Sequence, residues 1–432
     1  MNITIDDLKT VVIDQRREIE VIVKAVDIIQ RDKLEARRSL VGRGITTVIT
    51  GVRRCGKSVL CHQLLQGKEY QYINFDDERI TGLAPENLND ILKAFYELYG
   101  NPKFLLLDEV QNIEGWEIFV NRLNRLGIET MVTGSNSKLL SKELATHLTG
   151  RHISIELFPF SFSEFLRYDG HSFSESDLYD TKKVSFLKAK LEEYICIGGF
   201  PQAEKNRDIA RNYLSSLHSS VISKDIVMRH NLRRGGQLRE IANFLVSNPG
   251  EKVSYNRLKN LFGIKSVNTV KKYVSFIEEA YLVCIIDRFS FKHQEIIRSQ
   301  KKIYPIDTGL ANAISAKVIE NKGRMMECIV ALELMRRKSV DMHIYYWNDA
   351  GQREIDFVVQ NEKTITELIQ VCYRVDNEKT KARETRSLLG ASEVFKCNSL
   401  TIITWDFEGT EKIGEKEVKY VPLHKWLLQS SR

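Results

Sequence analysis

Short apolar runs separated by helical stretches predict a parallel sheet in the first part of the chain. The runs ITTVIT, YQYINF, KFLLLDEV and ETMVTGS begin at residues 45, 70, 103 and 129. Each run is nearly continuous, as expected of strands that are covered on both faces. Polar helical patterns lie between them, so we expect an α/β region built on a parallel sheet.

The segment before this region carries a polar, charge-rich helical pattern. It covers residues 1–40 and predicts an N-terminal helical arm that packs through an apolar stripe at spacings of three and four. The stripe consists of Val21, Ile22, Ala25, Ile28 and Ile29.

The pattern changes three times after the sheet region. The run ISIELFPFSFSEFL and the GGFP turn at 198–201 predict a helical lid attached to the sheet domain. Three helical stretches followed by the strand-like CIIDRFS predict a winged helix-turn-helix. A helix and several strands then predict a separate α/β domain. The predicted divisions are 1–40, 41–205, 206–300 and 301–432.

Composition narrows the class of protein. A chain of 432 residues is long enough for about two to four domains, and a net charge of +7 permits a polyanionic partner without requiring one. Seven scattered cysteines without metal-like spacing are typical of reduced thiols. No stretch reaches the ~18 apolar residues of a membrane span, and the N-terminus lacks the apolar core of a signal peptide. We therefore expect a soluble cytoplasmic protein that does not act at a membrane.

The motif GxxxxGK[ST] follows the first apolar run and precedes a helical pattern. This strand and helix context is what a phosphate-binding P-loop requires. Backbone N–H groups of such a loop surround the phosphates, the lysine reaches the β- and γ-phosphates, and the serine binds Mg²⁺. The expected ligands are thus ATP, or another nucleoside triphosphate, and Mg²⁺. The residues assigned to this loop are Gly51, Val52, Arg53, Arg54, Cys55, Gly56, Lys57, Ser58 and Val59.

Two later strand ends add polar groups at the same edge of the predicted sheet. Asp108 and Glu109 follow FLLL, which places Asp108 to hold the Mg²⁺ shell and Glu109 to act as the base for the attacking water. In MVTGSNS, Ser135 or Asn136 could orient that water, although a polar loop cap is an equally good interpretation of either residue.

These motifs resemble the prokaryotic AAA-superfamily ATPases that carry a C-terminal restriction-endonuclease-like domain. The resemblance rests on GVRRCGKS, LLLDEVQNIEGWE, TGSNSKLLSKELATHLTGR, ELFPFSFSEFL and GGFPQ. It implies a P-loop AAA-type nucleotide domain, a winged helix and a nuclease-like α/β domain. It also implies an arginine that closes the γ-phosphate site from the same chain or a neighbouring subunit, and Arg151 matches that position. An interdomain ion pair is the alternative for Arg151.

The predicted winged helix carries a polar and basic cluster at the start of its third helix, the end that enters the major groove in helix-turn-helix proteins. Arg233, Arg234, Arg288, Lys292 and His293 could add phosphate contacts. A protein-interaction module with a solvated lysine face is the alternative. The candidate DNA contacts are Lys265, Asn268, Lys271 and Lys272.

The last domain retains part of a nuclease pattern. Glu327 and Asp356 match the first two acidic positions of the family, which together would hold a divalent metal. The family's Glu-x-Lys is absent, because Gln370 and Cys372 occupy these two positions. A salt bridge or a helix cap is the alternative role of the two acids, and we expect nuclease chemistry to be lost.

Three functions are consistent with these motifs. The first is a Mg²⁺-dependent ATPase that acts as a switch on DNA or a protein partner. The second is an ATP-regulated DNA endonuclease, against which the missing Glu-x-Lys argues. The third is a nucleotide-dependent scaffold that binds protein and can self-associate.

Overall fold

The computed structural model describes residues 3–23, 28–136, 151–232, 235–316, 320–349, 351, 353–375 and 378–429. The chain forms two compact units. The first contains the described residues up to Phe158 together with Glu279–Tyr281, and the second contains Pro159–Glu278 and the residues from Leu282 onward. Residues 159–205, grouped with the sheet domain on sequence grounds, therefore cluster with the second unit.

The first unit is built on a parallel sheet, as the apolar runs predict. Within the part of the chain that is described, it has five strands in the order β2-β3-β4-β1-β5, and all neighbours are parallel. The strands are β1 (Thr46–Gly51), β2 (Gln71–Asn74), β3 (Phe104–Asp108), β4 (Glu129–Gly134) and β5 (His152–Leu157). Because they are parallel, their carboxyl ends share one edge, where Gly51, Asp108 and Gly134 lie.

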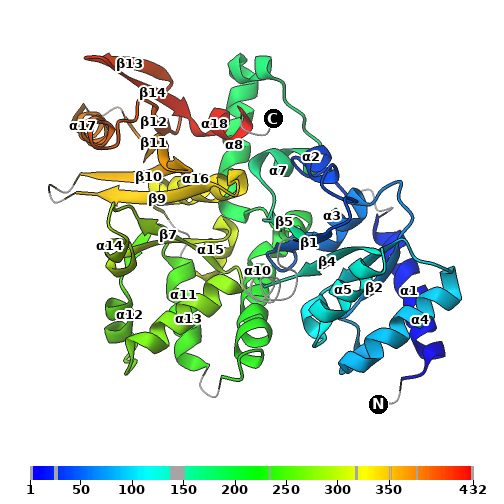
Figure 1. Cartoon of the computed structure of the whole chain (residues 1–432). Helices are drawn as coiled ribbons and strands as arrows, with labels where there is room; N and C mark the ends of the chain where they lie inside the picture. Colours follow the sequence, from blue (N-terminus) through cyan, green and yellow to red (C-terminus); the bar gives the residue numbers. More distant parts are fainter. Residues whose placement is uncertain are drawn as a thin grey trace. The chain divides into compact units, whose positions relative to one another are not determined.

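Helices cover this sheet, and the N-terminal helix belongs to its core. Helices α1 and α4 lie side by side in Figure 1, and α5 contributes to the same hydrophobic cluster. The helices are α1 (Ile5–Val23), α2 (Leu34–Arg38), α3 (Lys57–Leu64), α4 (Leu88–Tyr99) and α5 (Trp116–Arg125), with short 3-10 turns η1 (Glu78–Ile80), η2 (Pro85–Asn87) and η3 (Val110–Asn112).

The predicted packing stripe of the N-terminal arm is wrong. Val21 and Ile22 are 73% and 49% exposed, Ala25 lies outside the described residues, and the segment forms two helices. The face that packs is instead spaced by three and four residues from an earlier start, since these positions meet the apolar side of α4. It comprises Leu8, Val11, Val12, Gln15 and Ile19.

Helices form the first part of the second unit. They are α7 (Phe162–Tyr168), α8 (Thr181–Ile197), α9 (Pro201–Lys205) and α10 (Ala210–Ser220), with short turns η4 (Glu175–Tyr179) and η5 (Arg207–Ile209) and the π-helical η6 (Val221–Met228).

The next elements follow in the order helix, strand, helix, helix, strand, strand. A mixed α/β region then completes the unit. The first six are α11 (Gly236–Ser247), β6 (Glu251–Val253), α12 (Tyr255–Leu261), α13 (Val267–Glu279), β7 (Val283–Arg288) and β8 (Lys301–Pro305), with α14 (His293–Arg298) between the last two. The rest are α15 (Thr308–Ile314), α16 (Lys322–Arg337), β9 (Met342–Asn348), β10 (Glu354–Asn361), β11 (Thr364–Cys372), α17 (Glu378–Phe395), β12 (Leu400–Thr404), β13 (Gly409–Ile413), β14 (Lys416–Pro422) and α18 (Leu423–Gln429).

One sheet runs through both parts of this unit. Its strands, counted over the described residues, are nine in the order β13-β14-β12-β11-β10-β9-β7-β8-β6. The junction is a short parallel pairing of β7 with β9, in which Asp287 faces Tyr345 and Arg288 faces Tyr346. Helix α17 covers β10, β11 and β12 (Figure 1), and their apolar side chains form one core. The C-terminal region is therefore continuous with the region before it.

The GGFP turn is locked against the start of α15. Asp307 accepts hydrogen bonds from the backbone N–H groups of Gly199 (2.7 Å) and Leu310 (2.8 Å). A Cβ atom on Gly198, where φ is +83°, would lie 2.1 Å from Asp307 Oδ1, and one on Gly309 would lie 1.8 Å from Ile197 O. Only glycine fits these positions, so the turn fixes α8 to α15.

Candidate active site

The loop between β1 and α3 has the backbone of a phosphate-binding loop. Gly51 (φ +142°), Arg54 (φ +65°) and Gly56 (φ +96°) adopt positive φ, which brings the loop around the N-terminus of α3. A Cβ on Gly51 would lie 2.0 Å from Leu157 O, so this position requires glycine. The start of α3 supplies the unpaired N–H groups and the positive end of the helix dipole that favour an anion.

Arg31 braces this loop from outside the motif. Its guanidinium donates to the backbone oxygen of Cys55 (2.8 Å) and to that of Phe158 (2.7 Å). Cys55 is buried, and burial raises the pKa of its thiol. Residue spacing gave no signal for Arg31, because the contact joins segments 24 residues apart.

Lys57 is buried and points across the loop. Its ammonium donates to the backbone oxygens of Gly51 (3.3 Å) and Val52 (3.2 Å) and lies 3.8 Å from Glu109 Oε1. A lysine held in this way is directed toward the concave side of the loop. The ammonium is thus positioned to neutralise the charge of a phosphate bound in the loop. A lysine extended into solvent could not reach that phosphate.

Asp108 ends β3 and is completely buried. Thr133 donates to its Oδ1, Tyr72 donates to its Oδ2 (3.2 Å), and the Ser58 hydroxyl is hydrogen-bonded to the same carboxylate. Burial raises the pKa of Asp108, as does the carboxylate of Glu109, while the hydrogen bonds from Thr133 and Ser58 and the charge of Lys57 oppose that shift. The predicted pair of Ser58 and Asp108 is thus brought into direct contact.

Glu109 lies beside this cluster with a left-handed backbone (φ +52°). Its N–H donates to Thr133 Oγ1 (2.9 Å), and its side chain accepts from Gln111. A non-glycine residue in this conformation carries backbone strain, which is common at functional positions. Thr133 therefore organises both acids, and no signal in the sequence pointed to this residue.

The candidate residues that follow β4 are buried, whereas the candidate arginine before β5 is exposed. Ser135 and Asn136 are buried at the carboxyl end of β4, and Ser135 Oγ has no hydrogen-bond partner among the described residues. Arg151 is exposed, and its backbone oxygen accepts from Thr46 N at the amino end of β1. Since β1 rises about 3.3 Å per residue, Arg151 lies roughly 17 Å from the P-loop edge, so it cannot close this site within its own chain.

A polar cavity of about 550 Å³ adjoins the site. Ser58, Asp108, Tyr72 and Arg54 line it, together with residues of α1 such as Gln15. Arg53 lies 3.8 Å from Asp76, which also lines this cavity. The oxygens of Ser58 and Asp108, the ammonium of Lys57 and the N–H groups at α3 fit Mg²⁺ and a polyphosphate, because hard oxygen ligands and clustered donors are what these groups require.

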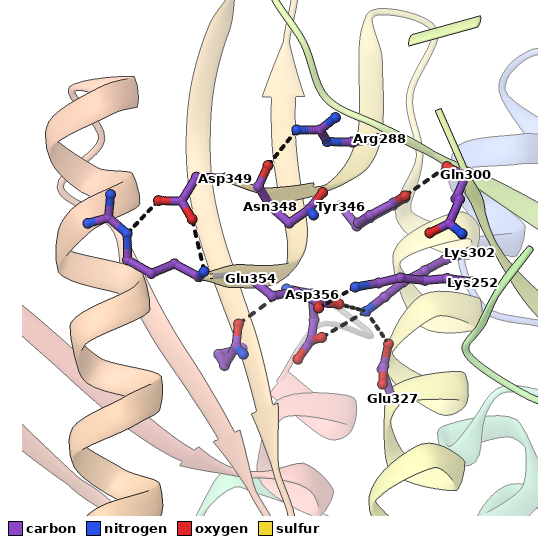
Figure 2. A network of polar contacts seen from close by, with 12 residues as sticks. Lys252, Arg288, Gln300, Lys302, Glu327, Tyr346, Asn348, Asp349, Glu354 and Asp356 are labelled. Carbon is purple, nitrogen blue, oxygen red and sulfur yellow. Dashed lines mark hydrogen bonds and ion pairs between the residues drawn. The ribbon is translucent and has the colours of Figure 1, made fainter. Parts of the chain in front are cut away.

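A second polar centre lies in the other unit, where Glu327, Asp356 and Gln370 line one cavity. A lysine that sequence reasoning missed joins them, Lys302 of β8 (Figure 2). Burial alone would lower the pKa of Lys302, but the surrounding carboxylates and Tyr304 hold that pKa well above its usual value. Gln370 accepts from Asp356 N (3.2 Å) and donates to Glu384 (2.6 Å).

The signal for Lys302 was a charged residue inside an apolar strand. In KKIYP, strand alternation places Lys302 and Tyr304 on one face, and a buried lysine requires an anionic partner. Glu384 had no comparable signal, because it lies in a charge-rich helix. No group of three or more His, Cys, Asp or Glu residues in the described ranges is arranged to hold a metal ion.

The basic residues of the third helix are exposed. The side chains of Lys265, Asn268, Lys271 and Lys272 all face solvent at the start of α13, and Lys271 lies 5.7 Å from the ring centre of Tyr255. Arg288, in contrast, donates to Asn348 O (2.7 Å), and Arg233 and Arg234 lie outside the described residues. Lys292 and His293 are exposed at the start of α14.

Family comparisons agree with the nucleotide-binding geometry. A family of AAA domains matches residues 44–166, and two domains of unknown function, DUF8612 and DUF4143, match 188–320 and 322–426. Uncharacterized protein MJ1544 of Methanocaldococcus jannaschii is 36% identical over 398 residues, covering 88% of each chain. An uncharacterized protein of Haemophilus influenzae is 30% identical, covering 88% of this chain and 94% of its own.

Among solved structures, the Walker-type ATPase PABY2304 of Pyrococcus abyssi is similar with a TM-score of 0.44 and 14% identity, covering 67% of this chain and 96% of that one. The matched AAA domain, together with the P-loop, defines the class of protein as an AAA-type P-loop ATPase. Within that class, the chain belongs to the family of the Methanocaldococcus and Haemophilus proteins. No helix in the described ranges has the length and apolar character needed to span a membrane.

Proposed function

We propose that the protein is a Mg²⁺-dependent ATPase that acts as a nucleotide-driven switch on DNA. The convergence of Lys57, Ser58, Asp108 and Glu109 at one edge of the parallel sheet carries this proposal. Lys57 and Ser58 come from the start of α3, and Asp108 and Glu109 come from the end of β3, yet each lies within hydrogen-bonding or ion-pair reach of another member of the cluster. Such a cluster is the expected machinery of phosphoryl transfer to water.

The chain's own residues divide the work of hydrolysis. The α3 N–H groups and Lys57 hold the polyphosphate, and Asp108 and Ser58 hold the Mg²⁺ shell. Bound Mg²⁺ withdraws negative charge from the phosphate oxygens. Glu109 accepts the proton of the attacking water. The hydroxyl of Thr133 fixes the position of Glu109 by accepting a hydrogen bond from the Glu109 backbone N–H. Arg151 can contribute charge to a γ-phosphate only from a neighbouring copy of the chain.

The second unit supports nucleic acid as the partner. The order α11, β6, α12, α13, β7, β8 supports a winged helix-turn-helix, in which α13 would be the recognition helix. Its first turns present Lys265, Lys271 and Lys272 to solvent, where they could neutralise phosphates.

A steady-state ATPase assay with and without duplex DNA tests the proposal. We expect Mg²⁺-dependent hydrolysis that DNA alters, and none above background for Lys57→Ala. DNA binding should also differ between the ATP-bound and nucleotide-free protein. Hydrolysis that DNA leaves unchanged, combined with no salt-dependent DNA binding, would favour a protein partner; no hydrolysis and no nucleotide binding would refute the ATPase itself.

A further inference from the structure

The polar centre of the second unit opens into a cavity of about 670 Å³. Lys302, Glu327 and Asp356 lie at this cavity together with Lys252 and Glu354 (Figure 2). The nuclease-like resemblance implies a divalent metal shared by Glu327 and Asp356. Whether the residues fit such a metal can be judged from the contacts of each oxygen.

Lys302 occupies the space between the acids. Its ammonium donates to Glu327 Oε1 (2.7 Å), Asp356 Oδ1 (2.9 Å) and Glu354 Oε1 (3.0 Å), and its side chain is 3% exposed. An ammonium has three N–H donors, and each carboxylate takes one. The cation therefore has a complete set of ligands supplied by α16 and β10.

Two further donors hold the oxygens of Glu327 and Asp356 in place. Asp356 Oδ2 accepts from Val371 N (3.0 Å), and Tyr304 donates to Glu327 Oε1 (2.6 Å). A divalent cation binds oxygens at roughly 2.0–2.6 Å, so between Glu327 and Asp356 it would need the same atoms that the ammonium holds. The residues present do not fit a metal while Lys302 is in place.

The charges of the centre agree with this arrangement. Two ammoniums, Lys252 and Lys302, face three carboxylates, with Lys252 paired to Glu354. A carboxylate at position 370 would face the carboxylate of Glu384, which is paired with Arg383, whereas the neutral Gln370 donates to Glu384 and accepts from Asp356 N. A neutral residue at position 370 thus agrees with a centre whose cation is one monovalent ammonium and not a divalent metal.

We infer that the ammonium of Lys302 is the resident cation of this centre, standing where a nuclease of similar fold would hold a divalent metal, and that it keeps such metals out. The three carboxylates and the Lys302 ammonium pair with one another at the wall of the cavity. A phosphodiester that enters the cavity meets no metal-activated water, so the domain does not cleave it by metal-dependent hydrolysis. The inference does not depend on the ATPase proposal, because it concerns a different unit.

Mn²⁺ binding to the full chain without nucleotide tests this inference, with Asp108→Asn in every sample to remove metal binding at the first site. By paramagnetic resonance titration we expect the Asp108→Asn protein to bind no Mn²⁺ at micromolar to low millimolar concentration. Adding Lys302→Met, which keeps chain length and removes charge, should create about one site per chain. The added change Asp356→Asn should abolish that site.

Removing a buried cation can unfold the protein, so a second variant and a second readout are included. Lys302→Met with Glu354→Gln removes one carboxylate together with the buried ammonium and keeps Glu327 and Asp356, the two acids that a metal needs. In either variant Mn²⁺ should raise Tm by roughly 5 °C at one hundred times its Kd, with no change in the Asp108→Asn protein. A Mn²⁺ site in the Asp108→Asn protein that Asp356→Asn removes would overturn the inference, as would folded Lys302→Met variants that bind none.

Discussion

The phenol of Tyr72 donates a hydrogen bond to Oδ2 of Asp108, 3.2 Å away, while Thr133 donates to the other oxygen. Burial and the nearby Asp108 charge raise the pKa of Tyr72, so its proton stays in place as a donor. The two donors fix both the rotation and the charge of the carboxylate proposed to hold the Mg²⁺ shell. Neither donor belongs to the P-loop motif.

Tyr72→Phe is therefore expected to act on the metal requirement of hydrolysis. Losing a hydrogen bond to a charged group costs about 1.5–3 kcal/mol, so the Mg²⁺ concentration for half-maximal activity should rise on the order of tenfold. Activity measured across a Mg²⁺ titration checks this. Tyr96→Phe, at an exposed tyrosine of α4, is the matched control and should leave the curve unchanged. An unaltered Mg²⁺ curve for Tyr72→Phe would show that the contact does not position Asp108.

Glu109→Gln should separate binding from hydrolysis. The amide keeps the size of the side chain but cannot take a proton, and a general base typically contributes 10²–10⁴-fold, so we expect turnover to fall by about a hundredfold or more. Affinity for ATP, measured by calorimetry, should stay close to that of the unmodified protein, whereas Lys57→Ala should lose most of it. Wild-type turnover in Glu109→Gln would show that another residue acts as the base.

Charge reversal of Lys271 and Lys272 should weaken DNA binding without regard to sequence. Two lost phosphate contacts reduce the slope of log affinity against log salt by about two. A fluorescence titration at several salt concentrations measures this slope. Lys338→Glu with Lys363→Glu, two exposed lysines elsewhere in the same unit, is the control. Equal slopes for both double variants would favour a protein partner for α13.

Asp307 should make the second unit less stable as pH rises from about 4 to about 6. Burial raises its pKa to about 6 from the ordinary value of 3.8, although hydrogen bonds from Gly199 and Leu310 oppose the shift. The folded state therefore holds this proton more tightly. Its contribution is fully present below pH 4 and is lost by pH 6, a change of about 3 kcal/mol.

Urea unfolding of the second unit across this pH range, compared with Asp307→Asn, isolates the effect. The variant should be less stable overall, because one backbone N–H loses its acceptor, and the stability difference between the proteins should shrink as pH rises. Asp341→Asn, at an exposed position, should follow the wild type. A difference that grows with pH would contradict the assignment.

The sequence predicted well what depends on local pattern. The parallel strands, the P-loop context and the helices of residues 236–279 are confirmed because apolar periodicity and turn residues determine them over short stretches. The joining of Ser58 to Asp108 also followed, since the carboxyl ends of parallel strands meet at one edge.

What the sequence did not predict depends on contacts between distant segments. Lys302 meets Asp356 across 54 residues, and Tyr72 meets Asp108 across 36. The packing stripe of the N-terminal arm was predicted wrongly for a related reason. Residues 1–40 contain two sets of positions at helical spacing, and contact with α4 selects the set that begins at Leu8. Arg151 matched a motif position, but the direction of β5 places it at the opposite end of the sheet.

The pairing of β7 with β9 has a mechanical consequence. Backbone hydrogen bonds connect the part that carries α13 and Lys302 to the part that carries Asp356, so both parts belong to one sheet. The cavity at Lys302 is lined from both parts, so its shape consequently depends on this pairing. Neither the pairing of β7 with β9 nor that of β7 with β8 depends on the length of the segment between β7 and β8. Lengthening that segment should therefore leave the cavity unchanged.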